Sequence, residues 1–156
     1  LAQMTALALR RLGANGRRFF LLVEGSGIDK RNHRADPCGQ IGETIDFDEA
    51  IAVAAADPEL LVIVTADHAH SSQAIWPAYG DFHSPGSYST LLTREGASMV
   101  VNYGTNVAGQ PQSHSGTQVR AAARGPGAER LHGLIGQPEV HRLMLDALGL
   151  EAPAAR

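Results

Sequence analysis

Residues 60–70 read LLVIVTADHAH, a continuous apolar run that changes abruptly to carboxylate and imidazole side chains. The run Leu60–Thr65 is typical of a strand that is buried on both faces of a parallel sheet. Asp67, His68 and His70 follow at the point where this strand ends. In open α/β sheets, ligands bind beyond the carboxyl ends of the strands. The stretch therefore predicts a layered α/β fold with a polar site at the edge of its sheet.

A second stretch, VEGSGIDKRNH at residues 23–33, repeats this design. The apolar run Arg18–Val23 predicts a strand that ends at Glu24, which is either a capping carboxylate or a hard oxygen ligand suited to magnesium. Asp29 and His33 lie four residues apart, so one helical turn places both side chains on one face, about 5–6 Å apart. This spacing suits two ligands of one zinc ion.

The remaining candidate residues have competing interpretations. Adjacent side chains of a strand point to opposite faces, so Asp67 and His68 reach one ion only where the strand has ended; the alternative is a helix cap followed by a surface histidine. His70 is placed to hydrogen-bond and orient a ligating carboxylate. His114 by itself is typical of a solvated loop. Three further histidines are interpreted as solvated surface residues: His83, His132 and His141.

The kinds of ligand indicate the kind of metal site. The candidate ligands are three imidazoles and three carboxylates, with no thiolate among them. Structural zinc sites favour cysteine ligands, so this set favours a catalytic zinc site. Carboxylates gathered at one sheet edge would raise one another's pKa values unless cations lay between them. Two metal ions about 3.5–4 Å apart form the arrangement that stabilises both the attacking and the leaving oxygen in phosphoryl transfer.

Composition limits the function classes. The chain has 156 residues, of which 44% are hydrophobic, as expected of one globular domain. Its net charge is −3, from 13 Lys and Arg against 16 Asp and Glu, so no basic field for nucleic acid is predicted. The chain contains no run of about 18 apolar residues, so a membrane span is not predicted. Residues 1–11 predict an amphipathic helix rather than a signal peptide.

Cys38 is the only cysteine. It lies in the segment Asp36–Gln40, which we interpret as a turn beside the predicted metal site. Two states remain open for its side chain: a reduced or buried thiol, and a disulfide to a residue outside this chain.

Helix and strand signals alternate along the chain, which favours an α/β layered sheet. Residues 71–96 are predicted to form a long surface excursion, and Thr44 or Asp46 to cap the second helix. Helices are predicted at 1–13, 43–56 and 138–148, and strands at 18–23, 60–65, 98–103 and 118–123.

Five motifs, taken in order, resemble the C-terminal third of bacterial alkaline phosphatases. They are VEGSGIDKRNH (23–33), PCGQIGET (37–44), IVTADHAH (63–70), GASMVVNYG (96–104) and SHSGTQVRAAARGP (113–126). The resemblance implies part of a three-layer αβα sandwich with a mostly parallel central sheet whose N-terminal strands are absent. It assigns residues 1–150 to the C-terminal part of that domain and leaves 151–156 as a frayed tail.

The resemblance also implies roles for individual residues, with two zinc ions and one magnesium ion as cofactors. Asp29, His33 and His114 match the ligands of the first zinc, Asp67 and His68 match ligands of the second zinc, and Glu24 matches a magnesium ligand. Lys30 matches a residue that positions phosphate through water, and His70 a hydrogen-bond partner of Asp29. Cys38 matches a disulfide cysteine whose partner lies outside the chain.

The function that the resemblance implies is hydrolysis of phosphate monoesters, with inorganic phosphate as product and a phosphoserine intermediate. The serine elbow and the phosphate-binding arginine of the family are missing from these residues, so we expect them to be inactive alone. The alternatives are a sulfatase or nucleotide pyrophosphatase of the same superfamily, and a non-catalytic zinc-binding fragment that docks on another chain. A homodimer in the periplasm or secreted medium is implied for the complete enzyme.

Overall fold

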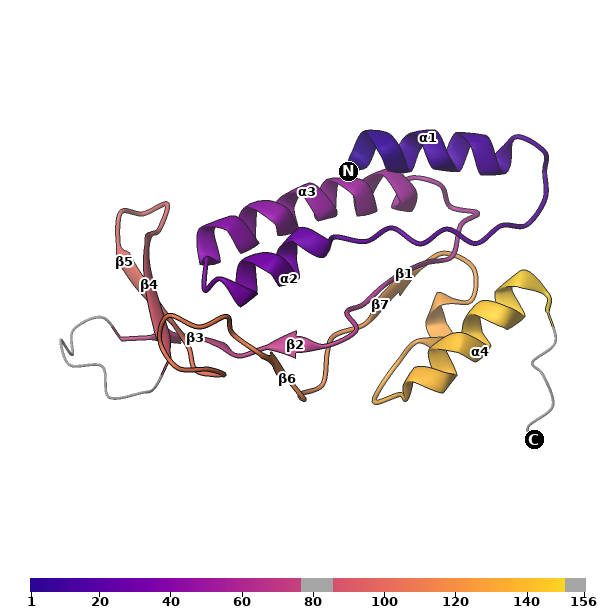
Figure 1. Cartoon of the computed structure of the whole chain (residues 1–156). Helices are drawn as coiled ribbons and strands as arrows, with labels where there is room; N and C mark the ends of the chain where they lie inside the picture. Colours follow the sequence, from indigo (N-terminus) through magenta and orange to yellow (C-terminus); the bar gives the residue numbers. More distant parts are fainter. Residues whose placement is uncertain (77–85, 151–156) are drawn as a thin grey trace. The chain divides into compact units, whose positions relative to one another are not determined.

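The computed structural model describes residues 1–76 and 86–150, and its combination of helices and strands confirms the predicted α/β class (Figure 1). The chain forms two compact units: Leu1–Glu24, Phe47–Thr65 and Arg120–Arg156 make up the first, and Gly25–Asp46 and Ala66–Val119 the second. Within the described ranges, every helix is too short or too polar to cross a lipid bilayer. The tail predicted at 151–156 lies outside the described residues.

Two helices of the first unit were predicted from their apolar periodicity, and both are confirmed. Helix α1 spans Ala2–Gly13 and α4 spans Gln137–Leu148. Gly149 ends α4 in the left-handed conformation, with φ of 65°, and its N–H donates to the carbonyl of Asp146. Glycine is favoured at this position because a Cβ atom would strain the backbone there. A short 3-10 helix, η1 (Ala128–Arg130), precedes α4.

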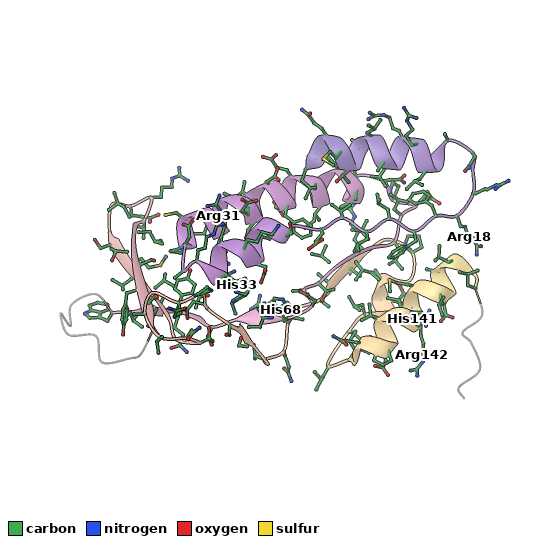
Figure 2. All side chains as sticks on the ribbon, in the orientation of Figure 1. Arg18, Arg31, His33, His68, His141 and Arg142 are labelled. Atoms are coloured by element: carbon green, nitrogen blue, oxygen red, sulfur yellow. The ribbon has the colours of Figure 1, made fainter. Side chains whose placement is uncertain are left out.

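His141 lies on α4 with an exposed side chain, next to Arg142 (Figure 2). We expect His141→Ala to change the free energy of unfolding by less than about 0.5 kcal/mol, since an exposed side chain loses little packing and alanine favours helix. Leu143→Ala on the same helix removes a buried side chain and is expected to cost about 2–5 kcal/mol. Urea denaturation compares the two variants; a loss above about 1 kcal/mol for His141→Ala would contradict this prediction.

In its described residues, the first unit contains one pair of strands. Strand β1 (Val62–Val64) pairs antiparallel with β7 (Ala122–Arg124), so that Ile63 lies opposite Ala123. These strands fall within or beside the predicted strands 60–65 and 118–123, but both are shorter. The three residues of β1 are half-buried rather than covered on both faces. Gly125 follows β7 with φ of 99°, and a Cβ there would lie 1.9 Å from the Leu60 carbonyl oxygen, so glycine lets the chains approach closely.

The described residues do not form the predicted parallel sheet. Every strand pair among them is antiparallel. The run Arg18–Val23, predicted as a strand, is not assigned to any sheet, and the side chains of Phe20 and Leu22 are exposed. An apolar run becomes a strand only when a neighbouring strand supplies its backbone partners. The pattern of apolar residues indicates that a segment favours burial. It does not indicate whether a neighbouring strand is present to pair with that segment.

A three-stranded antiparallel sheet forms the core of the second unit. Its order is β3 (Ser72–Ile75), β5 (Ser98–Tyr103) and β4 (Ser87–Leu92). Strand β5 has the predicted bounds, and Leu91, Val101 and Tyr103 pack together as a buried cluster.

The prediction of a surface excursion at 71–96 is therefore wrong for β3 and β4, while residues 77–85 lie outside the described part. Both strands flank β5, and their mostly polar sequences hide them from periodicity analysis. Polar residues are common on edge strands because one face meets solvent.

Two short strands connect the histidine-bearing segments of the second unit. Strand β2 (Ala69–His70) pairs antiparallel with β6 (His114–Ser115), and His70 lies directly opposite His114. Cross-strand neighbours in such a pair have Cβ atoms about 4.5–5.5 Å apart. This register brings residues that are 44 positions apart in the sequence into one site.

Helix α3 spans Pro37–Ala55 and begins six residues before the predicted start at Glu43. The Asp36 carboxylate accepts a hydrogen bond from the Gly39 N–H at 2.8 Å, and Pro37 occupies the first helical position. Both features favour a helix start at this point. The turn predicted at Asp36–Gln40 is thus the first turn of α3. The predicted cap Thr44 lies inside the helix, where its hydroxyl donates to the Gln40 carbonyl.

Candidate metal centre

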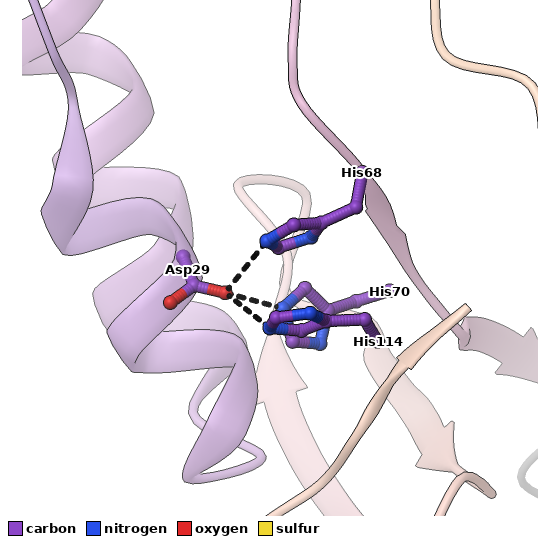
Figure 3. Close-up of side chains that lie close together, drawn as sticks. All are labelled: Asp29, His68, His70 and His114. Carbon is purple, nitrogen blue, oxygen red and sulfur yellow. Dashed lines mark hydrogen bonds and ion pairs between the residues drawn. The ribbon is translucent and has the colours of Figure 1, made fainter. Parts of the chain in front are cut away.

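One carboxylate oxygen of Asp29 is the focus of the site. Asp29 lies on helix α2 (Ser26–His33), which is longer than the single predicted turn. Its Oδ1 atom is 2.7 Å from His70 Nε2, 3.3 Å from His33 Nε2, 3.4 Å from His114 Nε2 and 3.8 Å from His68 Nε2. Figure 3 shows the imidazoles of His68, His70 and His114 converging on this oxygen; His70 and His114 lie on paired strands, and His68 directly precedes the first of them.

The three residues predicted to hold the first zinc form a compact set, hereafter the Asp29–His33–His114 set. Their ligand atoms are separated by 3.3 Å (Asp29–His33), 3.4 Å (Asp29–His114) and 3.1 Å (His33–His114). A tetrahedral zinc with bonds of about 2.0–2.1 Å has ligand atoms roughly 3.3–3.4 Å apart. The three side chains therefore fit one zinc ion with a fourth position left for another ligand.

The tautomer of His33 strengthens this fit. Its Nδ1 atom faces the backbone carbonyl of Gln112 at hydrogen-bonding distance, so Nδ1–H is the donor. The neutral ring then carries its lone pair on Nε2, which faces Asp29 and His114. Donation from the second ring nitrogen is the usual way in which a metal-ligating histidine is oriented.

His70 is the most buried imidazole of the cluster, with 7% of its side chain exposed. It makes the shortest contact with Asp29, at 2.7 Å, consistent with Nε2–H donating to the carboxylate. Among the described residues, His70 also forms a group with Asp29, His68 and His114 in which each residue offers one ligand atom, all within 4.8 Å of one another, so that the group could hold a metal ion. The role predicted for His70, orientation of Asp29, stays a prediction, and this geometry allows it.

The two residues predicted for the second zinc differ in position. The imidazole of His68 stacks on that of His114, with ring centroids 3.4 Å apart and 14° between the planes. Asp67 is 87% exposed, and its nearest imidazole contact is His68 Nε2, 3.5 Å from Oδ2. The structure thus brings His68 to the Asp29 oxygen and leaves Asp67 at the rim. Assignment of this pair to a second zinc stays a prediction.

The other predicted site residues are all exposed. Glu24, the predicted magnesium ligand, belongs to the first compact unit, whereas the histidine cluster belongs to the second. Lys30 follows Asp29 on α2 and lines a cavity together with His33. Cys38 lies in the first turn of α3 as a free thiol. The roles predicted for these three residues stay predictions.

Electrostatics keeps Asp29 ionised. Burial raises the pKa of this carboxyl, but the hydrogen bond from His70 and the neighbouring imidazoles of His33, His70 and His114 lower it by more. The net pKa of Asp29 is below its ordinary value. A carboxylate among several imidazoles is a donor set that zinc and similar divalent ions favour.

Gln112 is a site residue that sequence reasoning missed. It is 2% exposed, and its backbone N–H donates to the His33 carbonyl at 2.8 Å while its own carbonyl accepts from the His33 ring. Its side-chain Oε1 accepts bonds from the N–H groups of Thr105 and Asn106, at 3.2 Å each. A glutamine in a polar loop gives no signal of such burial. Its position two residues before His114 was the only hint.

Comparison with known proteins agrees with the motifs. Residues 1–110 match the alkaline phosphatase family. The chain is 50% identical over 155 residues to an alkaline phosphatase of Escherichia fergusonii, covering 97% of this chain and 32% of that protein. It is 50% identical to alkaline phosphatase H of Pseudomonas aeruginosa, over 96% of this chain and 32% of that protein.

A third relative has a different name. The chain is 48% identical to a streptomycin-6-phosphate phosphatase of Streptomyces griseus, over 94% of this chain and 33% of that protein. The chain therefore spans about one third of the length of these relatives. The match over residues 1–110 shows that this chain belongs to the alkaline phosphatase family.

Proposed function

We propose that this chain supplies the metal-binding part of an enzyme that hydrolyses phosphate monoesters. The observation that carries the proposal is the Asp29–His33–His114 set, whose three ligand atoms lie 3.1–3.4 Å apart. Family membership supports the reaction class. The mixed nitrogen and oxygen ligands favour a catalytic site over a structural one.

Two zinc ions and one magnesium ion are the proposed cofactors. In this proposal the Asp29–His33–His114 set holds the first zinc, Asp67 and His68 help to hold the second, and Glu24 contributes to the magnesium site. When bound, such ions act as Lewis acids and stabilise negative charge on the oxygens of a phosphoryl group. Hydrogen bonds to His33 and Asp29 fix the ligand atoms in advance, so little reorganisation is needed on binding.

The nucleophile in this proposal is a serine outside residues 1–156, which forms the phosphoserine intermediate. Lys30, exposed beside His33, positions the phosphate through its charge and a water molecule. The length of the relatives, about three times the matched segment, supports a contribution from elsewhere. A homodimer, a periplasmic or secreted location and a disulfide at Cys38 belong to the same proposal.

Metal removal with a substrate panel tests the function. The complete protein would be treated with a chelator and then reloaded with zinc and magnesium, alone and together. We expect hydrolysis of p-nitrophenyl phosphate to disappear with the metals and to return with them. The same preparation would be assayed on bis-p-nitrophenyl phosphate and p-nitrophenyl sulfate, for which we expect rates at least about a hundredfold lower.

The alternatives predict different outcomes of this panel. A preference for the diester or the sulfate would replace the phosphomonoesterase by a pyrophosphatase-like or sulfatase-like enzyme. Stoichiometric zinc binding without turnover of any ester would indicate the non-catalytic fragment. Turnover of the monoester that persists after complete metal removal would contradict the proposal.

A further inference from the structure

Helix α2 ends in a Schellman motif directly after His33, its last residue. The Ala35 N–H donates to the Asn32 carbonyl at 2.9 Å. The Asp36 N–H donates to the Arg31 carbonyl at 3.0 Å. This pair of bonds characterises the motif, which places a left-handed residue at the position that Ala35 occupies. The end of α2, and with it the predicted zinc ligand His33, therefore depends on the backbone conformation of Ala35.

Alanine is not the residue that this position favours. The φ angle of Ala35 is 52°, and within residues 1–76 and 86–150 every other positive φ belongs to a glycine. Glycine usually occupies the position because it has no Cβ atom to strain a left-handed backbone. The corner between α2 and α3 is therefore less stable with alanine than with glycine, so contacts from elsewhere in the fold are needed to hold it.

The three-stranded sheet of the second unit supplies those contacts. The Ser89 hydroxyl on β4 donates to the Ala35 carbonyl at 2.5 Å, across 54 positions of sequence. The Ala35 side chain packs against the buried cluster of Leu91, Val101 and Tyr103. Apolar packing is not directional, whereas a hydrogen bond favours one orientation of the carbonyl. Ser89 is thus the residue placed to select the left-handed conformation.

The backbone near His33 is held at a second point by Gln112, whose N–H donates to the His33 carbonyl at 2.8 Å. Ser89 acts two residues further along the chain. Metal sites are sensitive to such support, because groups that orient a ligand contribute to metal affinity. The His33 Nε2 atom lies 3.3 Å from Asp29 Oδ1 and 3.1 Å from His114 Nε2. Relaxation of the corner would spread these ligand atoms and weaken the site.

We propose that Ser89 is a positioning residue for the zinc site of the Asp29–His33–His114 set. Its hydroxyl holds Ala35 in the left-handed conformation and so fixes the end of α2 that carries His33. The inference rests on the proposed function, in which this set holds a zinc ion. Ser89 acts through the backbone of α2 and is not itself a ligand in this proposal.

The zinc affinity of the complete protein tests the inference independently of turnover. Metal-free protein would be titrated with zinc in competition with a chromogenic chelator, and the site that is lost in His114→Ala is the one to follow. Ser89→Ala is expected to lower the zinc affinity of this site about fivefold to tenfold. Ser89→Thr keeps the hydroxyl and is expected to retain most of the affinity.

A second substitution tests the cause of the loss. Glycine adopts the left-handed conformation without strain, so it does not need the bond from Ser89 to remain in it. Ala35→Gly in the Ser89→Ala background is therefore expected to restore most of the lost zinc affinity. Failure of the double variant to exceed Ser89→Ala would overturn the inference.

Two control variants separate positioning from a general loss of stability. Val100→Ala removes a side chain that is 4% exposed, from the face of β5 opposite to Val101, and so destabilises the same sheet away from Ala35. Thr90→Val removes an exposed hydroxyl next to Ser89 on β4. Both variants are expected to keep the wild-type zinc affinity, and denaturant unfolding of the metal-free proteins gives their stabilities.

The failure of this inference is distinguishable from the failure of the proposed function. Wild-type zinc affinity in Ser89→Ala would overturn the inference alone, and so would an equal loss of affinity in Val100→Ala. A wild-type protein that has no zinc site for His114→Ala to remove would overturn the proposed function and the inference together.

Discussion

His114→Ala is expected to remove one zinc per chain and to lower turnover of a phosphate monoester by about three orders of magnitude. His114 supplies one of the three ligand atoms of the Asp29–His33–His114 set, at 3.4 Å from Asp29 Oδ1 and 3.1 Å from His33 Nε2. Without it, two ligands remain, too few to hold zinc firmly. The side chain is 46% exposed, so its removal costs little packing and the fold should persist.

Metal analysis and the melting temperature, measured on the same samples, separate loss of a ligand from loss of structure. His132→Ala replaces another exposed histidine and is the control, expected to keep full metal content and activity. Retention of all bound zinc in His114→Ala would contradict the ligand assignment.

Asp67→Ala tests the second zinc in the same experiment. The carboxylate is 87% exposed and contacts the centre only through His68, so the structure alone gives no reason for a large effect. The family resemblance predicts that it is a ligand and that its loss abolishes one metal site. Unchanged metal content and activity in this variant would remove Asp67 from the proposed site.

Gln112→Ala is expected to lower the free energy of unfolding by about 3 kcal/mol and to weaken zinc binding about 10- to 100-fold. The side-chain oxygen accepts from the N–H groups of Thr105 and Asn106, at 3.2 Å each. Alanine leaves these donors without their acceptor inside the protein, and each buried unsatisfied donor costs about 1–3 kcal/mol. The loop that leads to His114 then loses part of its hydrogen bonding, and the carbonyl that orients His33 is expected to be held less firmly.

Two comparisons make this second prediction specific. Gln112→Glu keeps the accepting oxygen but loses the Nε2 donor to the Gln110 carbonyl, so an intermediate loss is expected. Gln110→Ala alters an exposed neighbour and is expected to change stability by less than about 0.5 kcal/mol. Denaturant unfolding gives the stability, and competition with a chromogenic chelator gives the zinc affinity. A Gln112→Ala protein with wild-type values of both would contradict the assigned positioning role.

Local signals predicted the helices well and the strand pairing poorly. The periodicity of α1 and α4 depends on residues three and four apart, so it can be read without knowing the rest of the fold. The start of α3 was placed too late because the cap formed by Asp36 was interpreted as a turn. Strands β3 and β4 were missed because their polar residues gain stability only from pairing with β5.

The sequence by itself determined which chemistry the site offers: carboxylates and imidazoles without thiolate, placed after apolar runs, with Asp29 and His33 on one helical face. Only the tertiary structure decided which of these groups meet. The pairing of β2 with β6 sets His70 opposite His114, and α2 brings Asp29 to both. The physical reason is that spacing along a helix fixes local neighbours, whereas contacts across a sheet depend on register. For the same reason, the burial of Gln112 and its bond to His33 were visible only in the folded chain.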